Sequence, residues 1–319
     1  MIEDVTNKDR IHRYVDVLSD AGFKAVFGDQ NNKQLLIDFL NVVLPPERQI
    51  KDLTYVNTEI PGLRPDNKSF HLDLRCEDLS GATFIIEMQR YHQNDFQQRC
   101  VQYAARVYSA KIQRGTRSYH IPPVYLIGIL AVDSFDRNEP GWNNKFISEF
   151  QFQEKTMHNL LCESIHLIFV ELKRFQKTLA ECSSLVDKWC YALKNLARLD
   201  RLPEELRIEA FTRLFEAAEI ARFNEEKREQ YEHDMRTELD WHNIEMTAEE
   251  RGRQDGLKEG LEKGIEQGQK EGREEGLKEG LEKGQMNERK LIIQTMLAKG
   301  FSPEQIAEMT GIAIDDIQS

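Results

Sequence analysis

Hydrophobic and polar residues alternate with two different periods along the first 222 residues of the chain. Residues 33–44 place apolar residues at helical spacing before two prolines, and residues 95–114 form an amphipathic pattern before a glycine, so each segment is predicted to be a helix. Four segments have the composition of strands: residues 50–60, 70–76, 83–89 and 123–132. Further strands are predicted at residues 146–154 and 166–172, and further helices at residues 179–199 and 204–222. The order of helix, three strands, helix and strand predicts an α/β fold with a mixed sheet.

Acidic and amide side chains interrupt two of these strands. Side chains alternate between the faces of a strand, so Glu87 and Gln89 share one face of their strand, and Asp73 lies in the strand before it. The polar, glycine-containing segment 77–82 is typical of a short hairpin connection, which lets the two carboxylates converge. Acids often occupy the solvent face of a strand, but residues 84–88 are apolar enough to be buried, where an unpaired carboxylate is costly. Two carboxylates and an amide suit Mg²⁺.

These residues resemble the signature of the PD-(D/E)XK nuclease superfamily. Asp73 is separated by thirteen residues from Glu87-Met88-Gln89, with glutamine where lysine usually stands. More narrowly, the chain is similar to the bacterial recombination-promoting nuclease, or putative transposase, family. That similarity is carried by five segments in order: Phe23-Lys24 with Phe27-Gly28, Phe39-Leu40-Asn41, Leu72-Asp73-Leu74, Ile86-Glu87-Met88-Gln89, and Arg99 with Tyr103. It is specific over residues 16–132 and looser over about the first 300 residues.

The resemblance implies a restriction-endonuclease-like core, with a mixed central sheet flanked by helices, and a C-terminal helical extension. It also implies a metal-dependent endodeoxyribonuclease that hydrolyses phosphodiester bonds and promotes DNA recombination. Asp73 and Glu87 would bind Mg²⁺ or Mn²⁺, and Gln89 would orient the attacking water without supplying the charge of a lysine. By the same resemblance Arg99, Gln102 and Tyr103 would contact DNA, and a solvated helix face is the alternative for each.

Some assignments stay open at the level of sequence. Asp66 follows a proline and so spells the opening pair of the superfamily signature, but its surroundings are those of a turn, and we prefer Asp73. Asp16, Asp20 or Glu59 could supply a third metal ligand. Two other functions also fit: a catalytically weak nuclease-fold protein that binds DNA or assembles, and a transposase-like protein that joins strands. The latter would need an end-specific DNA-reading module, and none is evident in complete form.

Charge and cysteine content indicate which partners and which cellular compartment to expect. A net charge of −12 argues against a general nucleic-acid coat, because phosphate affinity comes from clustered Lys and Arg. A local basic strip is nevertheless predicted after the second acidic strand, formed by Arg90, Arg99, Arg106, Lys111, Arg114 and Arg117. The five cysteines form no CxxC pair and fit a reducing compartment. With a charged N-terminus and no apolar stretch of about 20 residues, we expect a cytoplasmic protein without a membrane segment.

The chain is expected to have three parts: a PD-(D/E)XK nuclease-like domain at residues 1–222, a charged helix or linker at residues 223–286, and a small helical hairpin at residues 287–319. In the middle part, glycine recurs at every fourth position from Gly252 to Gly284 among good helix formers. Each glycine costs roughly 1 kcal/mol relative to alanine, so this helix is marginal alone. A flexible linker and a helix through which two chains form a homo-oligomer both fit the pattern.

Overall fold

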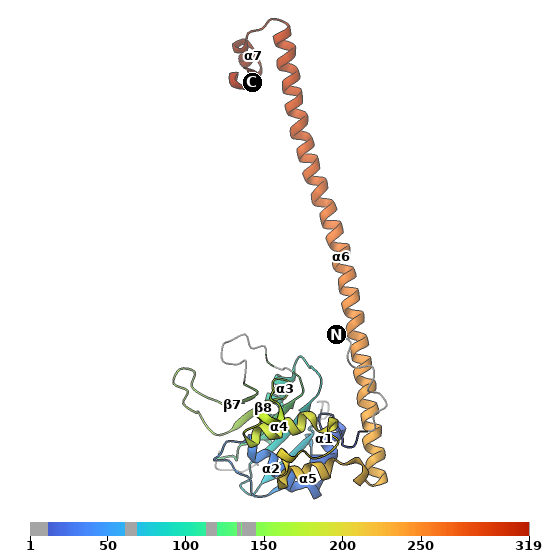
Figure 1. The fold of residues 1–319 in the computed structure, drawn as a ribbon. Helices are drawn as coiled ribbons and strands as arrows, with labels where there is room; N and C mark the ends of the chain where they lie inside the picture. The colour runs from blue at the N-terminus through green and yellow to red at the C-terminus, as the bar shows by residue number, and fades with distance from the viewer. Residues whose placement is uncertain (1–11, 61–68, 113–119, 133–134, 136–144, 319) are drawn as a thin grey trace. The chain divides into compact units, whose positions relative to one another are not determined.

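The computed structural model describes residues 12–60, 69–112, 120–132, 135 and 145–318 (Figure 1). They belong to two compact units, residues 1–241 and residues 242–319. Among the described residues, no helix combines the length and the apolar character that crossing a membrane requires.

A six-stranded mixed sheet forms the centre of the first unit, with strands in the order β1-β4-β5-β6-β8-β7. Its strands are β1 (Leu53–Tyr55), β4 (Leu74–Asp78), β5 (Thr83–Gln89), β6 (Val124–Leu130), β7 (Ile147–Phe150) and β8 (Ile165–Glu171). Strands β5, β6 and β8 run parallel to one another. β4 pairs antiparallel with β5, β7 pairs antiparallel with β8, and the edge strand β1 pairs antiparallel with β4. The predicted mixed sheet is therefore confirmed.

Helices cover both faces of this sheet (Figure 1). On one face the core contains residues of α1 (Asp20–Phe27), α2 (Lys33–Val43), α4 (Leu185–Asn195) and α5 (Glu209–Ala218). On the other face α3 (Phe96–Ala110) packs on Ile85 and the neighbouring strands. Short 3₁₀ helices connect these elements: η1 (Gln30–Asn32), η2 (Leu179–Glu181), η3 (Leu196–Arg198), η4 (Glu204–Leu206) and η5 (Ile220–Arg222). The arrangement is the α/β fold expected of a restriction-endonuclease-like core.

Two predicted strands are each broken in the structure. The predicted strand 50–60 divides into β1 and β2 (Glu59–Ile60), and the predicted strand 70–76 divides into β3 (Phe70–His71) and β4. β2 and β3 pair only with each other and form a separate two-stranded sheet. The placement of Asp73 within a strand was therefore wrong: it lies in the bend between β3 and β4, one residue before β4 begins.

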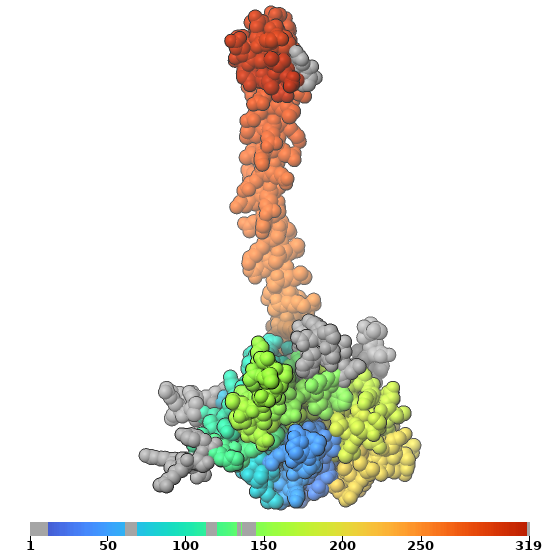
Figure 2. Space-filling model, turned by 90° about the vertical axis from the view of Figure 1, so that its left-hand side faces the viewer, coloured from blue at the N-terminus to red at the C-terminus, as the bar shows by residue number. Residues whose placement is uncertain are grey.

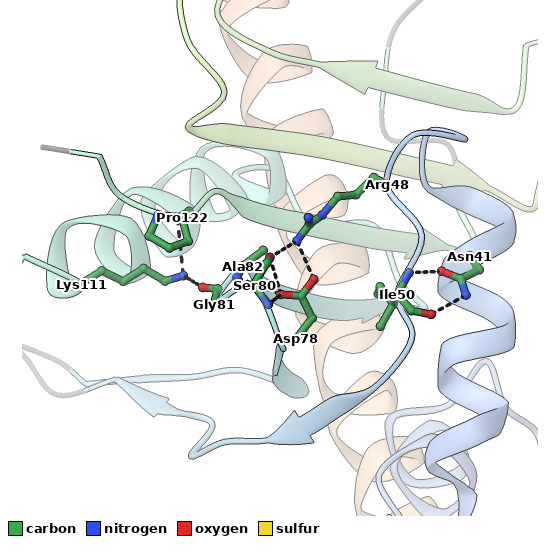
Figure 3. Close-up of polar contacts among 9 residues, drawn as sticks. All are labelled: Asn41, Arg48, Ile50, Asp78, Ser80, Gly81, Ala82, Lys111 and Pro122. Atoms are coloured by element: carbon green, nitrogen blue, oxygen red, sulfur yellow. Dashed lines mark hydrogen bonds and ion pairs between the residues drawn. The ribbon is translucent and has the colours of Figure 1, made fainter.

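Three contacts hold the turn between β4 and β5 in place (Figure 3). One carboxylate oxygen of Asp78 accepts from the Ser80 main-chain N at 2.9 Å, and the other oxygen pairs with Arg48 at 2.6 Å. Gly81 adopts a left-handed φ of 78°, and its carbonyl accepts from Lys111 Nζ at 2.5 Å. These contacts fix the register of the hairpin. A slip of one residue would turn every side chain of a strand to the opposite face.

The long helix α6 (Glu225–Ala298) runs through all nine glycines of the repeat. Its side chains from residue 247 to residue 292 are exposed, and Figure 2 shows them in orange. At its end, Ile293 packs with Ile306 of α7 (Pro303–Thr310) and Ile317 of α8 (Ile314–Gln318). Ser302 is the N-cap of α7 and forms a capping box with Gln305.

Candidate active site

Asp73 and Glu87 face one another across the β4–β5 hairpin. Leu74 lies opposite Ile86, so the same register carried back by one residue sets Asp73 opposite Glu87. The Asp73 main-chain N donates to Glu87 Oε1 at 3.3 Å, and the Met88 main-chain N donates to Asp73 Oδ2 at 2.7 Å. Each carboxylate is thus held by the main chain of the segment that carries the other. The structure brings together the two acids that the sequence singled out.

Burial disfavours two negative charges on this pair of carboxylates. Glu87 is only 4% exposed, and the Asp73 side chain is 18% exposed. Burial, with a smaller contribution from the charge of Asp20, raises the pKa of Asp73 to about 6. Burial and then the charge of Asp73 raise the pKa of Glu87 well above its ordinary value. A divalent cation would neutralise both groups, so the pair favours a cation or a proton between them.

Gln89 points into the same pocket and is held at both ends of its amide. It is 5% exposed, its Nε2 donates to the Tyr91 carbonyl at 2.5 Å, and its Oε1 accepts from Arg99 Nη2 at 3.1 Å. Arg99 also donates to Gln93 and lies over the Tyr103 ring at 5.9 Å. Gln89, which the sequence predicts to stand in the lysine position of the signature, is therefore fixed in place but carries no charge.

The pocket around these groups has a volume of about 290 Å³. It is lined by Asp20, His71, Asp73, Glu87, Met88, Gln89, Arg90, Tyr91, Gln93, Arg99, Tyr103 and Glu238. Of the three possible DNA contacts, Arg99 and Tyr103 line the pocket, whereas Gln102 is exposed on α3 and is not among the lining residues. Strand β5 and helix α3 thus supply most of the predicted site.

The candidates for a third acidic ligand are separated by the structure. Asp20 lines the pocket, Asp16 forms an ion pair with Arg90 at 2.8 Å, and Glu59 is exposed on β2. Within the described residues, no group of three or more His, Cys, Asp or Glu side chains is placed to hold a metal ion. Asp66 lies outside the described residues.

The two carboxylates still fit a hard divalent cation. Main-chain hydrogen bonds occupy one oxygen of each, so the other oxygen of each can face a ligand. Mg²⁺ is commonly bound by one or two carboxylates, with water and substrate phosphate completing its shell. A site with two carboxylates and an open pocket is consistent with that pattern.

Sequence reasoning missed one residue that lines the pocket, Glu238, and one cation close to its carboxylates, Lys24. Glu238 comes from α6, beyond the predicted end of the nuclease-like domain, and lies 3.8 Å from Arg90 Nε. Lys24 lies on α1 with its ammonium 4.0 Å from Asp73 Oδ1. Tyr231 was the available signal for α6: this aromatic residue stands in a charged run, packs against the core, and accepts a hydrogen bond from the Asp16 main-chain N.

The predicted basic strip is largely used for structure. Arg90 pairs with acidic side chains, and Lys111 binds the hairpin turn. Arg114 and Arg117 lie outside the described residues. Arg90 and Arg99 both line the pocket with Gln89 and the two carboxylates, and of these two Arg99 is the one that donates to Gln89.

Comparison with known families places this site in context. The family model described as PD-(D/E)XK nuclease family transposase matches residues 17–248, which include both carboxylates, Gln89 and Glu238. Comparisons with curated proteins and with solved structures gave no match. Because the family model covers more than half of the chain, the protein belongs to the PD-(D/E)XK nuclease family transposases.

Proposed function

We propose that this protein is a Mg²⁺-dependent DNA endonuclease that promotes DNA recombination. The single observation that carries the proposal is the pair of carboxylates, half-buried Asp73 and buried Glu87, beside Gln89 in a pocket of about 290 Å³. Membership of a nuclease and transposase family supports DNA as the substrate. Action on DNA in a bacterium would place the protein in the cytoplasm.

In this proposal Asp73 and Glu87 bind Mg²⁺, or Mn²⁺ in its place. The bound cation would supply an activated water and neutralise charge on the scissile phosphate. Gln89 orients the attacking water through its amide, and Arg99 holds that amide from α3. The water oxygen forms a bond to phosphorus and releases one proton to solvent, the phosphodiester P–O bond breaks, and the leaving oxygen takes a proton from solvent.

Cleavage of supercoiled plasmid tests this proposal. The protein should nick plasmid in Mg²⁺ and not in EDTA, and Asp73→Asn and Glu87→Gln should each reduce the rate by at least about 1,000-fold, because each removes a ligand charge. Asp52→Asn is the matched control, since Asp52 forms an exposed ion pair with Lys33 at 2.7 Å. Retained cleavage in either pocket variant would refute the assignment. DNA binding without cleavage would favour the catalytically weak alternative, and joining of added DNA ends would favour strand transfer.

We further propose that α6 mediates self-association. All nine glycines from Gly252 to Gly284 have open space where a Cβ would lie, and the leucines beside them are exposed, including Leu257, Leu261 and Leu277. Nine helix glycines cost roughly 9 kcal/mol relative to alanine, at about 1 kcal/mol each, so a lone helix here would be poorly stable. Close packing of two such helices would use the glycines and bury the leucines.

Light scattering on the full chain tests self-association. Removal of residues 250–319 should convert an oligomer to a monomer without unfolding the first unit. Alanine at alternate glycines discriminates between the two roles of the repeat, because added methyl groups block close helix contact but strengthen a solitary helix. A full-length protein that is monomeric at micromolar concentration would leave the repeat as a charged spacer.

A further inference from the structure

Gln89 leaves one requirement of the proposed reaction without a group to meet it. Attack on a phosphodiester builds negative charge on the phosphate oxygens, and a positive charge held beside them lowers the barrier. The amide of Gln89 is neutral and cannot titrate. Both of its ends are also engaged, with the Tyr91 carbonyl and with Arg99. Any positive charge beyond that of the proposed cation therefore has to come from another side chain.

Lys24 and Arg99 are the two cations whose charge lowers the pKa of both Asp73 and Glu87, against the larger opposing effect of burial. The Arg99 guanidinium is anchored, since it donates to Gln89 and Gln93. The Lys24 ammonium is less committed: it pairs with Asp20 at 2.8 Å and lies 4.0 Å from Asp73 Oδ1. Its side chain is 47% exposed, so a substrate phosphate can reach it.

The position of Lys24 is set by a rigid element. Ser19 caps the N-terminus of α1 by accepting from the Gly22 main-chain N, and Phe23 and Phe27 of the same helix are fully buried. Lys24 lies one turn after Asp20, so the two side chains share a face of the helix and pair directly. Lys24 also lines a neighbouring hollow of about 380 Å³ between α1 and the first turns of α6. From this fixed backbone its flexible side chain brings the ammonium to 4.0 Å from Asp73 Oδ1.

We propose that Lys24 is a catalytic residue that supplies, from α1, the positive charge which lysine supplies at the Gln89 position in other PD-(D/E)XK nucleases. Its ammonium contacts the scissile phosphate beside Asp73. The inference rests on the proposed nuclease function, and it adds a residue that lies 49 positions before Asp73 in the sequence. An ammonium is suited to this role because it is a compact point charge with three donors on a flexible stem.

Four variants of the full chain test the proposal on supercoiled plasmid. Lys24→Met removes the charge and should lower the single-turnover rate in Mg²⁺ by about 100- to 1,000-fold, as expected for a lost contact to developing charge. Lys24→Arg should retain most of the rate. In the Lys24→Met background, Gln89→Lys should restore at least about tenfold. Lys227→Met is the matched control, because Lys227 lines the same hollow but pairs with Asp29 at 2.8 Å, and its rate should equal that of the wild type.

Binding of Ca²⁺, measured by calorimetry without DNA, separates a catalytic charge from a structural one. Lys24→Met removes a positive charge beside the carboxylates, so its Ca²⁺ affinity should be unchanged or higher. A lower affinity would mean that Lys24 only orients Asp73, and would overturn the proposal. Cleavage by Lys24→Met within threefold of the wild type, or no rescue by Gln89→Lys, would overturn it as well. If the wild type itself neither binds Ca²⁺ nor cleaves, the proposed nuclease function fails instead.

Discussion

The substitution Asp73→Asn should stabilise the metal-free protein. Asparagine keeps an oxygen that can accept from the Met88 main-chain N, as Asp73 Oδ2 does at 2.7 Å, but it removes a charge that burial disfavours. Burial raises the pKa of Asp73 from 3.8 to about 6. At about 1.4 kcal/mol per tenfold change in the proton equilibrium, the ionised group costs the folded state about 2–3 kcal/mol at pH 8. For a unit of this size that corresponds to a rise in Tm of about 4–10 °C.

The rise in Tm caused by Asp73→Asn should grow as pH rises. Between pH 4 and pH 6 the folded protein holds a proton on Asp73 that the unfolded chain has already lost, so the cost of the charge grows as pH rises through this window. The stabilisation by asparagine should therefore be full at pH 8, partial at pH 5 and small at pH 4. Scanning calorimetry in EDTA at these three pH values measures it. Addition of Mg²⁺ at pH 8 should raise the Tm of the wild type and not that of the variant.

Asp78 provides a matched control at the other end of β4. Its carboxylate accepts from Ser80 and pairs with Arg48 at 2.6 Å, so Asp78→Asn removes a partnered charge from the hairpin turn. The same chemical change should lower the Tm there. A lower Tm for Asp73→Asn at pH 8, or an equal gain at pH 4 and pH 8, would show that the Asp73 charge is compensated in the folded protein and that the reasoning is wrong.

Three further predictions follow from the same contacts. Ca²⁺ affinity of the wild type should fall as pH drops below about 6, because burial raises the pKa of Asp73 to about 6 and protons then compete with the cation; calorimetry that finds constant affinity down to pH 5 would contradict this. Gln89→Ala should slow plasmid cleavage by about 10- to 100-fold and Gln89→Lys should keep or raise the rate, whereas an unchanged rate in Gln89→Ala would make the amide a bystander. A chain that ends at residue 222 should have a Tm at least about 5 °C below that of a chain that ends at residue 246. The shorter chain lacks Tyr231, which packs against the core, and the 2.8 Å ion pair between Lys227 and Asp29. Equal Tm values would place the domain boundary at residue 222.

The layered architecture could be predicted from sequence because its signals are local. Residues 33–44, 83–89 and 123–132 carry helical or strand patterns that coincide with α2, β5 and β6 to within a few residues. The hairpin connection was also readable, since Gly81 and its polar neighbours favour a turn. A hairpin places β4 beside β5, and this pairing is enough to bring Asp73 and Glu87 together.

The bend at Asp73 could not be predicted, because it depends on long-range pairing. β3 leaves the main sheet to pair with β2, and Ile60 and Leu72 pack under α3. Nothing local in the alternation of residues 70–76 distinguishes one continuous strand from two. Lys24 and Glu238 were missed for a related reason. Each lies on a helix whose sequence predicts only a surface position, and tertiary packing brings Lys24 close to Asp73 and Glu238 close to Arg90.

Asp73 and Asp78 flank the same strand and are the same residue type, yet they have opposite relations to stability. Asp78 sits in a turn that supplies a guanidinium and main-chain donors, so its charge is matched where it lies. Asp73 sits opposite a second buried carboxylate, and its nearest cation is 4.0 Å away. Two neighbouring acids without a close cation do not stabilise the folded protein, and electrostatic strain of this kind is typical of a site that binds a ligand. The contrast between the two ends of β4 is therefore a physical reason, independent of family membership, to place the cation and the substrate at Asp73 and Glu87.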